Sequence, residues 1–436
     1  MLPVTPGSLT GFAKRNKYRY APADSCSRSH RARGLEICAG IGYNGSMKFQ
    51  DIIVGGGASG VVTAIMLARK GRKTLVLEAQ DRALKKLLAS GNGRCNLSNS
   101  AVCPERYNAP SFVAPSLSAF GLEDVKDFFL SVGIELREED GRWYPYSLSA
   151  GSVVNALLRA AEKAGVVTVC GAKADRITKD GLFCVSAAGK TYYAENVIFT
   201  AGSNATSGLD SLSLLSSFGH FSTEKFASVS YIPSDSVKGA SGVRAKAALK
   251  LICGGTTVFS GEGELLFKDN ALSGILAFEA SSRYARMLRE GKTCEGRIDF
   301  TPDRSEIQLK EFFEKCDLDC VDALCAYVHR ALAVAIAKKA GVKGAAEDNA
   351  DKLASVLKNY RVVFGGVCDI KNAQVVSGGL DLKDFDPHGL QSFKLKGLFA
   401  AGEALDVDGD CGGFNLHWAW ASAHAVAVKI AEGRNV

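Results

Sequence analysis

The run Ile52-Ile53-Val54-Gly55-Gly56-Gly57-Ala58-Ser59-Gly60 decides the fold, because it joins an apolar strand to a helix through a G-x-G-x-x-G turn. Helical spacing of apolar residues follows at residues 59–70. In such a turn, Gly55 makes the tight bend, Gly57 lets the backbone approach a pyrophosphate, and Gly60 allows close packing of helix on strand. The helix N-terminus adds N–H donors for phosphate. The sequence therefore predicts a dinucleotide-binding βαβ unit.

An acidic residue follows at the place where such a unit binds ribose. The second strand, expected at residues 73–77, is followed directly by Glu78. A carboxylate there can accept hydrogen bonds from both ribose hydroxyls, whereas a 2′-phosphate would meet like charge. NADP is therefore disfavoured as the resident nucleotide, and FAD and NAD both remain.

Two distant glycine elements favour FAD over NAD. Thr200-Ala201-Gly202 follows a buried strand expected at residues 197–200, and Gly402-Glu403 follows another expected at 398–401. An extended FAD needs contacts from such separate segments. The run 406–416 then precedes a long apolar helix expected at 414–432, whose N-terminus can stabilise negative charge on a flavin ring. An ordinary glycine-rich helix entry capped by Asp or Asn is the alternative interpretation of that run.

A basic, glycine-containing stretch, residues 85–96, is suited to the second phosphate and one edge of the ring. We expect Arg94 and Asn415 to tune the flavin. Cys95 is a candidate redox thiol, but Cys103 lacks the C-x-x-C spacing of a resolving partner. His417 lies beside the predicted flavin loop, and its simpler interpretation is a packed histidine.

The predicted cofactor-binding residues come from these segments, with Ala174 in addition. They are Gly55, Gly57, Ala58, Ser59, Gly60, Glu78, Ala79, Lys86, Gly91, Gly93, Arg94, Cys95, Asn96, Ala174, Ala201, Gly202, Gly402, Glu403, Asp408, Gly412, Gly413, Phe414, Asn415 and Leu416. No catalytic residue is assigned, and the candidates to watch are Arg94, Cys95, Asp269 and His417.

Composition excludes several classes of protein. The 436 residues are 47% apolar and 23% charged, as in globular proteins of two or three domains. The net charge is +7, but residues 1–46 carry +5, which leaves only +2 elsewhere and gives no electrostatic reason to propose nucleic acid or an anionic membrane as partner. Apolar runs are too short to cross a bilayer. We expect a soluble, cytoplasmic protein that acts on a small molecule.

Cysteine and histidine usage indicates neither disulfides nor metal. The 13 cysteines are scattered without framework spacing, so we expect reduced thiols. Cys316, Cys320 and Cys325 lack the fourth ligand of an iron–sulfur cluster and are interpreted as part of a core helix. No histidines have metal-ligand spacing, so no metal site is expected.

Changes in pattern along the chain predict four segments. Residues 1–46 are expected to be a disordered basic leader or an upstream-extended start before Met47, rather than an organelle transit peptide. Residues 47–221 and 361–436 are expected to form a discontinuous FAD-binding domain. Residues 222–303 read as a β-barrel-like insert, and residues 304–360 as a helical insert.

Several longer runs resemble one family. Ser90-Gly-Asn-Gly-Arg-Cys-Asn96, Trp143-Tyr-Pro145, Gly263-Glu-Leu-Leu-Phe267, Ser273-Gly274 and the runs 402–408 and 418–420 are similar to the BaiN/YhiN-like (bile-acid-reductase-like) NAD(P)/FAD-dependent oxidoreductases. The resemblance covers Met47 to the C-terminus. It implies an α/β fold: an FAD-binding Rossmann-like domain of the glutathione-reductase superfamily type, with β-barrel and helical insert domains.

The chain departs from this family pattern in places where a substrate is expected to lie. Residues 268–271 replace a usual Thr-His pair and glycine, and Ile275 replaces a proline. Asp410, Cys411, Phe414 and His417 replace Pro, Thr, Tyr and Gln. The resemblance therefore implies FAD binding more firmly than it implies a substrate.

The resemblance implies reduction of a conjugated carbon–carbon double bond, as in an oxo-steroid. NAD(P)H would reduce FAD, and flavin N5 would pass hydride to the β-carbon of the enone. No second G-x-G-x-x-G follows a strand, so we expect NAD(P)H to bind transiently over the flavin. Two alternatives remain: an FAD-dependent amine oxidase or dehydrogenase, and a non-catalytic flavin-binding or RNA-associated protein.

Overall fold

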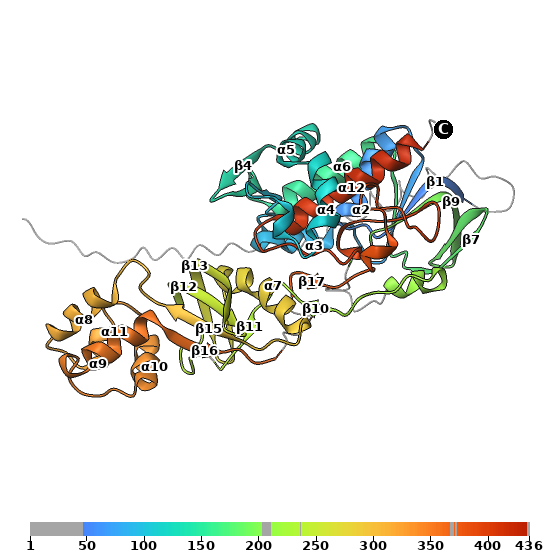
Figure 1. Ribbon diagram of the computed structural model, residues 1–436. Coiled ribbons are helices and arrows are strands. Elements are labelled where there is room, and N and C mark those ends of the chain that lie inside the picture. Colours follow the sequence, from blue (N-terminus) through green and yellow to red (C-terminus); the bar gives the residue numbers. More distant parts are fainter. Residues whose placement is uncertain (1–46, 203–210, 236, 367–369, 371–372, 434–436) are drawn as a thin grey trace, which may run out of the picture. The chain divides into compact units, whose positions relative to one another are not determined.

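A mixed sheet of seven strands forms the base of the nucleotide-binding region (Figure 1). The computed structural model describes residues 47–202, 211–235, 237–366, 370 and 373–433, which lie within one compact unit. The strand order is β6-β2-β1-β9-β8-β7, and β18 pairs with β9. The strands are β1 (Met47–Val54), β2 (Thr74–Glu78), β6 (Val167–Cys170), β7 (Ala174–Asp180), β8 (Leu182–Ala187), β9 (Lys190–Phe199) and β18 (Leu398–Ala400).

The parallel part of this sheet contains the predicted βαβ unit, whose two strands are β1 and β2. Strands β6, β2, β1, β9 and β18 run parallel, while β7 and β8 form an antiparallel meander with β9. The strand expected at residues 197–200 is the end of a longer strand, β9. Its first half alternates between exposed and buried residues beside β8, and its last residues are all buried between β1 and β18. That change of burial explains why one strand shows two sequence patterns.

Helices from both ends of the chain cover the parallel strands. They and their neighbours are α2 (Ala58–Arg69), α3 (Lys85–Ala89), α4 (Pro110–Ala119), α5 (Leu122–Ser131), α6 (Ala150–Lys163) and α12 (Phe414–Glu432). Figure 1 shows α12 beside α2, and the two helices pack against each other. Buried residues of α12, including Trp418 and Trp420, join the core of the sheet. A small sheet of β3 (Ser98–Asn99), β4 (Leu136–Glu139) and β5 (Arg142–Pro145) lies between these helices in sequence.

A second, antiparallel sheet of six strands has its own hydrophobic core. Its strands, in the order β11-β14-β13-β12-β15-β16, are β11 (Ile232–Pro233), β12 (Arg244–Cys253), β13 (Thr256–Lys268), β14 (Ala271–Ser273), β15 (Cys294–Asp299) and β16 (Tyr360–Val363). The two end strands approach each other through a bridge between Ser234 and Phe364. The sheet therefore curls toward closure. The helical insert is expected to end at residue 360 and the FAD-binding domain to resume at residue 361. Strand β16 crosses this boundary and pairs with β15, so it belongs to the sheet of the insert.

A helix and a disulfide in this insert differ from the sequence expectations. Helix α7 (Ile275–Arg289) packs on β13, within the segment expected to be a β-barrel. The expectation of no disulfides is wrong: Cys253 and Cys294 form one, because they lie directly opposite each other on β12 and β15. A short pair, β10 (Phe226–Ala227) and β17 (Val376–Ser377), accompanies the insert.

The helical segment contains α8 (Glu306–Glu314), α9 (Cys320–Leu324), α10 (Arg330–Ala340) and α11 (Ala350–Lys358). Helix α8 packs on α11, and α9 packs on α10. Ser305 caps α8 by accepting a hydrogen bond from the backbone of Gln308, and Asp319 caps α9. The expectation for residues 1–46 lies outside the described residues.

Candidate functional site

Four parallel strands end at one edge of the large sheet, and the predicted nucleotide residues follow them. Strands β1, β2, β9 and β18 end at Val54, Glu78, Phe199 and Ala400. In open α/β sheets ligands bind outside the carboxyl ends of the strands. The glycine turn, Glu78 and the two later glycine elements are therefore gathered at this edge.

The glycine turn leaves open space at the start of α2. A Cβ on Gly60 would lie 2.0 Å from the carbonyl oxygen of Gly55, and a Cβ on Gly55 would lie 2.5 Å from that of Thr200, so both positions need glycine. A Cβ on Gly57 would meet no heavy atom within 4 Å. Gly57 is also the N-cap of α2 and has no side-chain cap, so the first-turn N–H groups face this space. These residues fit a pyrophosphate.

The carboxylate of Glu78 is held in place by two backbone donors. Oε2 accepts from Gly56 N at 2.7 Å, and Oε1 accepts from Gln80 N at 2.7 Å. Each carboxylate oxygen has more than one lone pair, so both retain acceptor capacity for ribose hydroxyls. Glu78 thus lies beside the turn in an orientation suited to the adenosine ribose.

The third glycine element contacts the first directly. A Cβ on Gly402 would lie 2.4 Å from Ser59 Oγ, which requires the small residue there. Gly402 N donates to Ser422 Oγ at 3.0 Å and its carbonyl accepts from Trp418 Nε1 at 3.1 Å, so α12 fixes its position. The next residue, Glu403, has Oε2 2.6 Å from Lys86 Nζ. The structure therefore brings Lys86 and Gly402 to the same place as Ser59.

A second group of predicted residues meets at the start of α12. A Cβ on Gly413 would lie 2.5 Å from Ser98 O and 2.8 Å from Asn96 Oδ1. Asn96 Oδ1 is buried without a hydrogen-bond partner among the described residues, and α12 begins at Phe414 without a side-chain cap. An unpaired acceptor beside free helix N–H donors fits a polar ring that both donates and accepts, such as the pyrimidine end of a flavin.

Three of the catalytic candidates lie in different environments. Arg94 pairs with Glu139, and its guanidinium lies 4.4 Å from the ring centre of Tyr144. Cys95 is fully buried, and burial raises the pKa of its thiol to about 12. Asp269 is exposed in the turn between β13 and β14.

His417 is a packed histidine. It is fully buried, with Nδ1 2.8 Å from Ser98 Oγ and Nε2 3.2 Å from the carbonyl oxygen of Phe120. Burial lowers the pKa of His417 to about 4. In the loop before α12, the Cys411 thiol also has its pKa raised to about 12, chiefly by burial.

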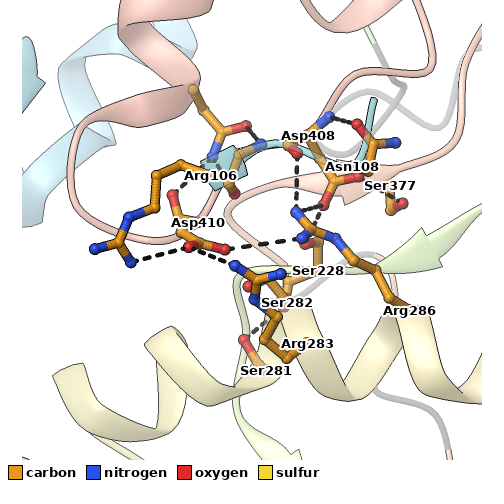
Figure 2. A network of polar contacts seen from close by, with 12 residues as sticks. Arg106, Asn108, Ser228, Ser281, Ser282, Arg283, Arg286, Ser377, Asp408 and Asp410 are labelled. Atoms are coloured by element: carbon orange, nitrogen blue, oxygen red, sulfur yellow. Dashed lines mark hydrogen bonds and ion pairs between the residues drawn. The ribbon is translucent and has the colours of Figure 1, made fainter. Parts of the chain in front are cut away.

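Two predicted cofactor residues hold the loop before α12 instead of facing open space. Asn415 is bonded to Gly409 in both directions, at 2.9 Å each. Asp408 is fully buried and accepts from Ser377 and Ser228 at 2.9 and 3.0 Å and from Arg286 at 3.4 Å (Figure 2). The remaining predicted residues are placed as follows: Ala79 directly after β2, Ala174 at the start of β7, Ala201 and Gly202 after β9, Gly91 and Gly93 in the turn after α3, Gly412 beside Asn99, and Leu416 in the first turn of α12.

Sequence reasoning missed the arginines that face this loop. Arg283, Arg286 and Arg289 of α7 pair with the acidic residues of the run 406–410. The signal was present: arginine recurs every third residue in 283–289, and aspartate every second residue in 406–410. Spacing alone does not indicate that the two series meet.

Comparisons with known proteins show that most of the chain matches one protein family. Residues 49–429 match the family described as HI0933-like protein Rossmann domain. The 3-dehydro-bile acid delta(4,6)-reductase of Clostridium scindens is 31% identical over 404 residues, covering 87% of this chain and 98% of that protein. The ribosomal RNA dihydrouridine synthase of Escherichia coli is 26% identical over 410 residues, covering 88% and 98%. Together with the parallel sheet and its glycine turn, the family match confirms the predicted Rossmann-like α/β class.

Solved structures show a looser likeness. A 3-ketosteroid-delta4-(5alpha)-dehydrogenase from Rhodococcus jostii is 13% identical with a TM-score of 0.45, covering 88% of this chain and 97% of that one. A flavocytochrome c3 fumarate reductase is 14% identical, also with a TM-score of 0.45, covering 92% and 81%. In the part of the chain that the structure describes, the helices are too short or too polar to span a bilayer.

Proposed function

The chain belongs to the HI0933-like protein Rossmann domain family, and on that premise we propose that it is an FAD-dependent reductase of carbon–carbon double bonds conjugated to a carbonyl group. The observation that carries the proposal is the meeting of Gly57, Glu78 and Gly402 at one sheet edge, with open space beside Gly57. This arrangement is suited to the ADP half of FAD, and the start of α12 is suited to its ring.

Each group of residues has a distinct task in this proposal. The N-terminus of α2 binds the pyrophosphate, Glu78 binds the ribose, and Lys86 lies near the site with Glu403 as its partner. The N-terminus of α12 stabilises negative charge on the ring. When bound, reduced FAD supplies the hydride for the reaction. Among the predicted residues, the thiol of Cys95 is too buried and too weakly acidic to act as a nucleophile.

The names of the relatives support this reaction class without fixing the substrate. A bile acid delta(4,6)-reductase and a dihydrouridine synthase both, by their names, add two hydrogens across a carbon–carbon double bond. In both substrates this double bond is conjugated to a carbonyl group. An enone-bearing small molecule is the first candidate, since the relative with that substrate is 31% identical. Uridine in ribosomal RNA is the second candidate, favoured by the 26% identity to the synthases.

Anaerobic stopped-flow spectroscopy of the FAD-reconstituted protein tests this proposal. We expect NADH or NADPH to bleach the flavin absorbance, and an oxo-steroid enone to restore it. Restoration by uridine-containing ribosomal RNA and not by enones would select the second candidate. Hydrogen peroxide formed with an amine, without reduction by either nicotinamide, would favour an amine oxidase. Absence of a flavin spectrum after reconstitution would overturn the proposal.

A further inference from the structure

Three arginines of α7 face three aspartates of the segment 406–410. Residues three apart on a helix share a face, and alternate residues of an extended segment share a side. The rungs are Arg289 Nη2 to Asp406 Oδ2 at 3.2 Å, Arg286 Nη2 to Asp408 Oδ2 at 3.4 Å, and Arg283 Nη2 to Asp410 Oδ2 at 3.0 Å. Figure 2 shows the Arg283 and Arg286 rungs between the helix and the loop. We call these three pairs the arginine ladder.

The central rung is the most buried. The Asp408 side chain is 0% exposed and that of Arg286 is 12% exposed. Arg286 also donates to the Asp408 carbonyl oxygen at 3.0 Å, so it bonds both the side chain and the backbone of one residue. Asp408 Oδ1 and Oδ2 accept from Ser377 and Ser228 as well. A buried charge with several hydrogen bonds of this kind defines one position for the backbone that carries it.

The ladder ends directly before the loop that is proposed to face the flavin. Asp410 is followed by Cys411 and the two glycines that lead into α12. Arg142 pairs at 2.6 Å with Glu279, which lies four residues before Arg283 on α7. Arg142 Nε also lies 3.6 Å from the point where a Cβ of Gly412 would lie. Helix α7 therefore contacts Asp410 directly through Arg283 and is connected to Gly412 through Arg142.

We propose that the arginine ladder, and Arg286 above all, positions residues 409–413 at the cofactor, so that the insert helix α7 sets the surroundings of the flavin ring. This inference rests on the proposed FAD site. Arg286 acts as a positioning residue: it holds the backbone that carries the N–H donors and does not itself contact the cofactor. Loss of the central rung lets the loop shift, which weakens FAD binding and changes the environment of the bound ring.

The test compares Arg286→Gln with the control Arg361→Gln, which removes an exposed ion pair to Glu295 elsewhere on the insert. FAD titration of the apoprotein should give a dissociation constant about tenfold higher for R286Q, a typical size for coupling between structural elements. At saturating FAD, the visible absorption maxima of R286Q should also shift, while R361Q should match the wild type. Arg286→Lys should restore the spectrum in part, because it keeps the charge without the planar fork.

Two outcomes distinguish failure of the proposed FAD-dependent function from failure of the arginine-ladder inference. If wild-type protein binds no FAD, the proposed function fails and this inference falls with it. If wild-type protein binds FAD and R286Q matches R361Q in affinity and spectrum, only the ladder inference fails. Should R286Q not fold, Arg283→Gln gives the same comparison at an outer rung, where the side chain is 32% exposed. An unchanged spectrum and affinity in R283Q would then overturn the inference.

Discussion

The hydroxyl oxygen of Ser98 lies 2.8 Å from Nδ1 of His417, and both residues are fully buried. On the other side of the ring, Nε2 lies 3.2 Å from the carbonyl oxygen of Phe120. Burial lowers the pKa of His417 to about 4, so at pH 7 the imidazole is neutral and carries one hydrogen. A carbonyl can only accept, so that hydrogen is on Nε2, and Nδ1 accepts from Ser98.

This neutral histidine makes stability depend on pH. The unfolded chain binds a proton on His417 below about pH 6.5, whereas the folded chain does so only below a pH of about 4. Between these values the unfolded state binds more protons, so this stabilising contribution is full above pH 6.5 and is lost as the pH falls toward 4. We expect a loss of about 3 kcal/mol over that window. Urea unfolding of the wild type at pH 7 and pH 4.5 measures it.

The matched variants for this prediction are His417→Gln and His388→Gln, the latter at an exposed histidine. H417Q should lose the part of the pH dependence between 6.5 and 4.5 that comes from His417, while His220 and His424, whose pKa values burial also lowers, keep their contributions. H388Q should keep the wild-type dependence. Equal slopes for H417Q and wild type would show that His417 does not control this transition.

A second prediction concerns the buried ion pair between Asp51 of β1 and Arg72. Arg72 Nη2 donates to Asp51 Oδ1 at 2.7 Å, and the side chains of Arg72 and Asp51 are 3% and 0% exposed. Arg72→Met should lower the free energy of unfolding by about 3–5 kcal/mol, because it leaves a buried carboxylate with too few partners. The double variant Asp51→Leu/Arg72→Met should lose less than R72M alone. Urea unfolding of all three proteins checks the order, and a larger loss in the double variant would contradict it.

The parts of the fold that the sequence predicts correctly depend on residue patterns within single segments. The glycine turn, the following helix and the bounds of α12 at residues 414–432 agree with the structure, because each depends on spacing within one segment. The convergence of Gly57, Glu78 and Gly402 was also predictable, since parallel strands bring their carboxyl ends to one edge.

The parts that sequence reasoning missed depend on pairing between distant segments. Arg286 and Asp408 are 122 residues apart, and neither position shows which face of α7 lies toward the loop. The disulfide joins Cys253 to Cys294, 41 residues on, through a strand register that scattered cysteines do not indicate. The same limit applies to β16, which returns to the insert sheet after the helical segment.

A third prediction distinguishes Gly57, which lies beside open space, from Gly60, which packs closely against the backbone of Gly55. Gly57 has φ −78° and ψ −169°, an extended conformation open to any residue, and a Cβ there meets no heavy atom within 4 Å. Gly57→Val should therefore fold with nearly wild-type stability but lose FAD affinity ~10-fold or more, because the side chain fills the space for the pyrophosphate. Gly60→Ala should instead destabilise the fold, since its Cβ would lie 2.0 Å from Gly55 O.

The control for this prediction is Gly151→Ala on α6, where a Cβ would meet only Ser149 Oγ, at 3.5 Å. A helical glycine replaced by alanine gains roughly 0.5–1 kcal/mol and should keep the flavin. Flavin content after gel filtration and thermal unfolding measure both effects. Unchanged flavin content in G57V would mean that the space beside Gly57 does not hold the cofactor.

The last prediction distinguishes three chemical states of cysteine by iodoacetamide labelling at pH 8. Cys325 is exposed and should react in the native protein. Cys95 should not, because it is fully buried and its thiol pKa is raised to about 12, so little thiolate forms. In urea without reductant Cys95 should react, whereas Cys253 and Cys294 should react only after reduction, since they are joined in a disulfide. Peptide mass mapping reads out each site. Native labelling of Cys95 at the rate of Cys325 would show an accessible thiol beside the proposed flavin site, and labelling of Cys253 in urea without reductant would show that the two insert cysteines are reduced in solution.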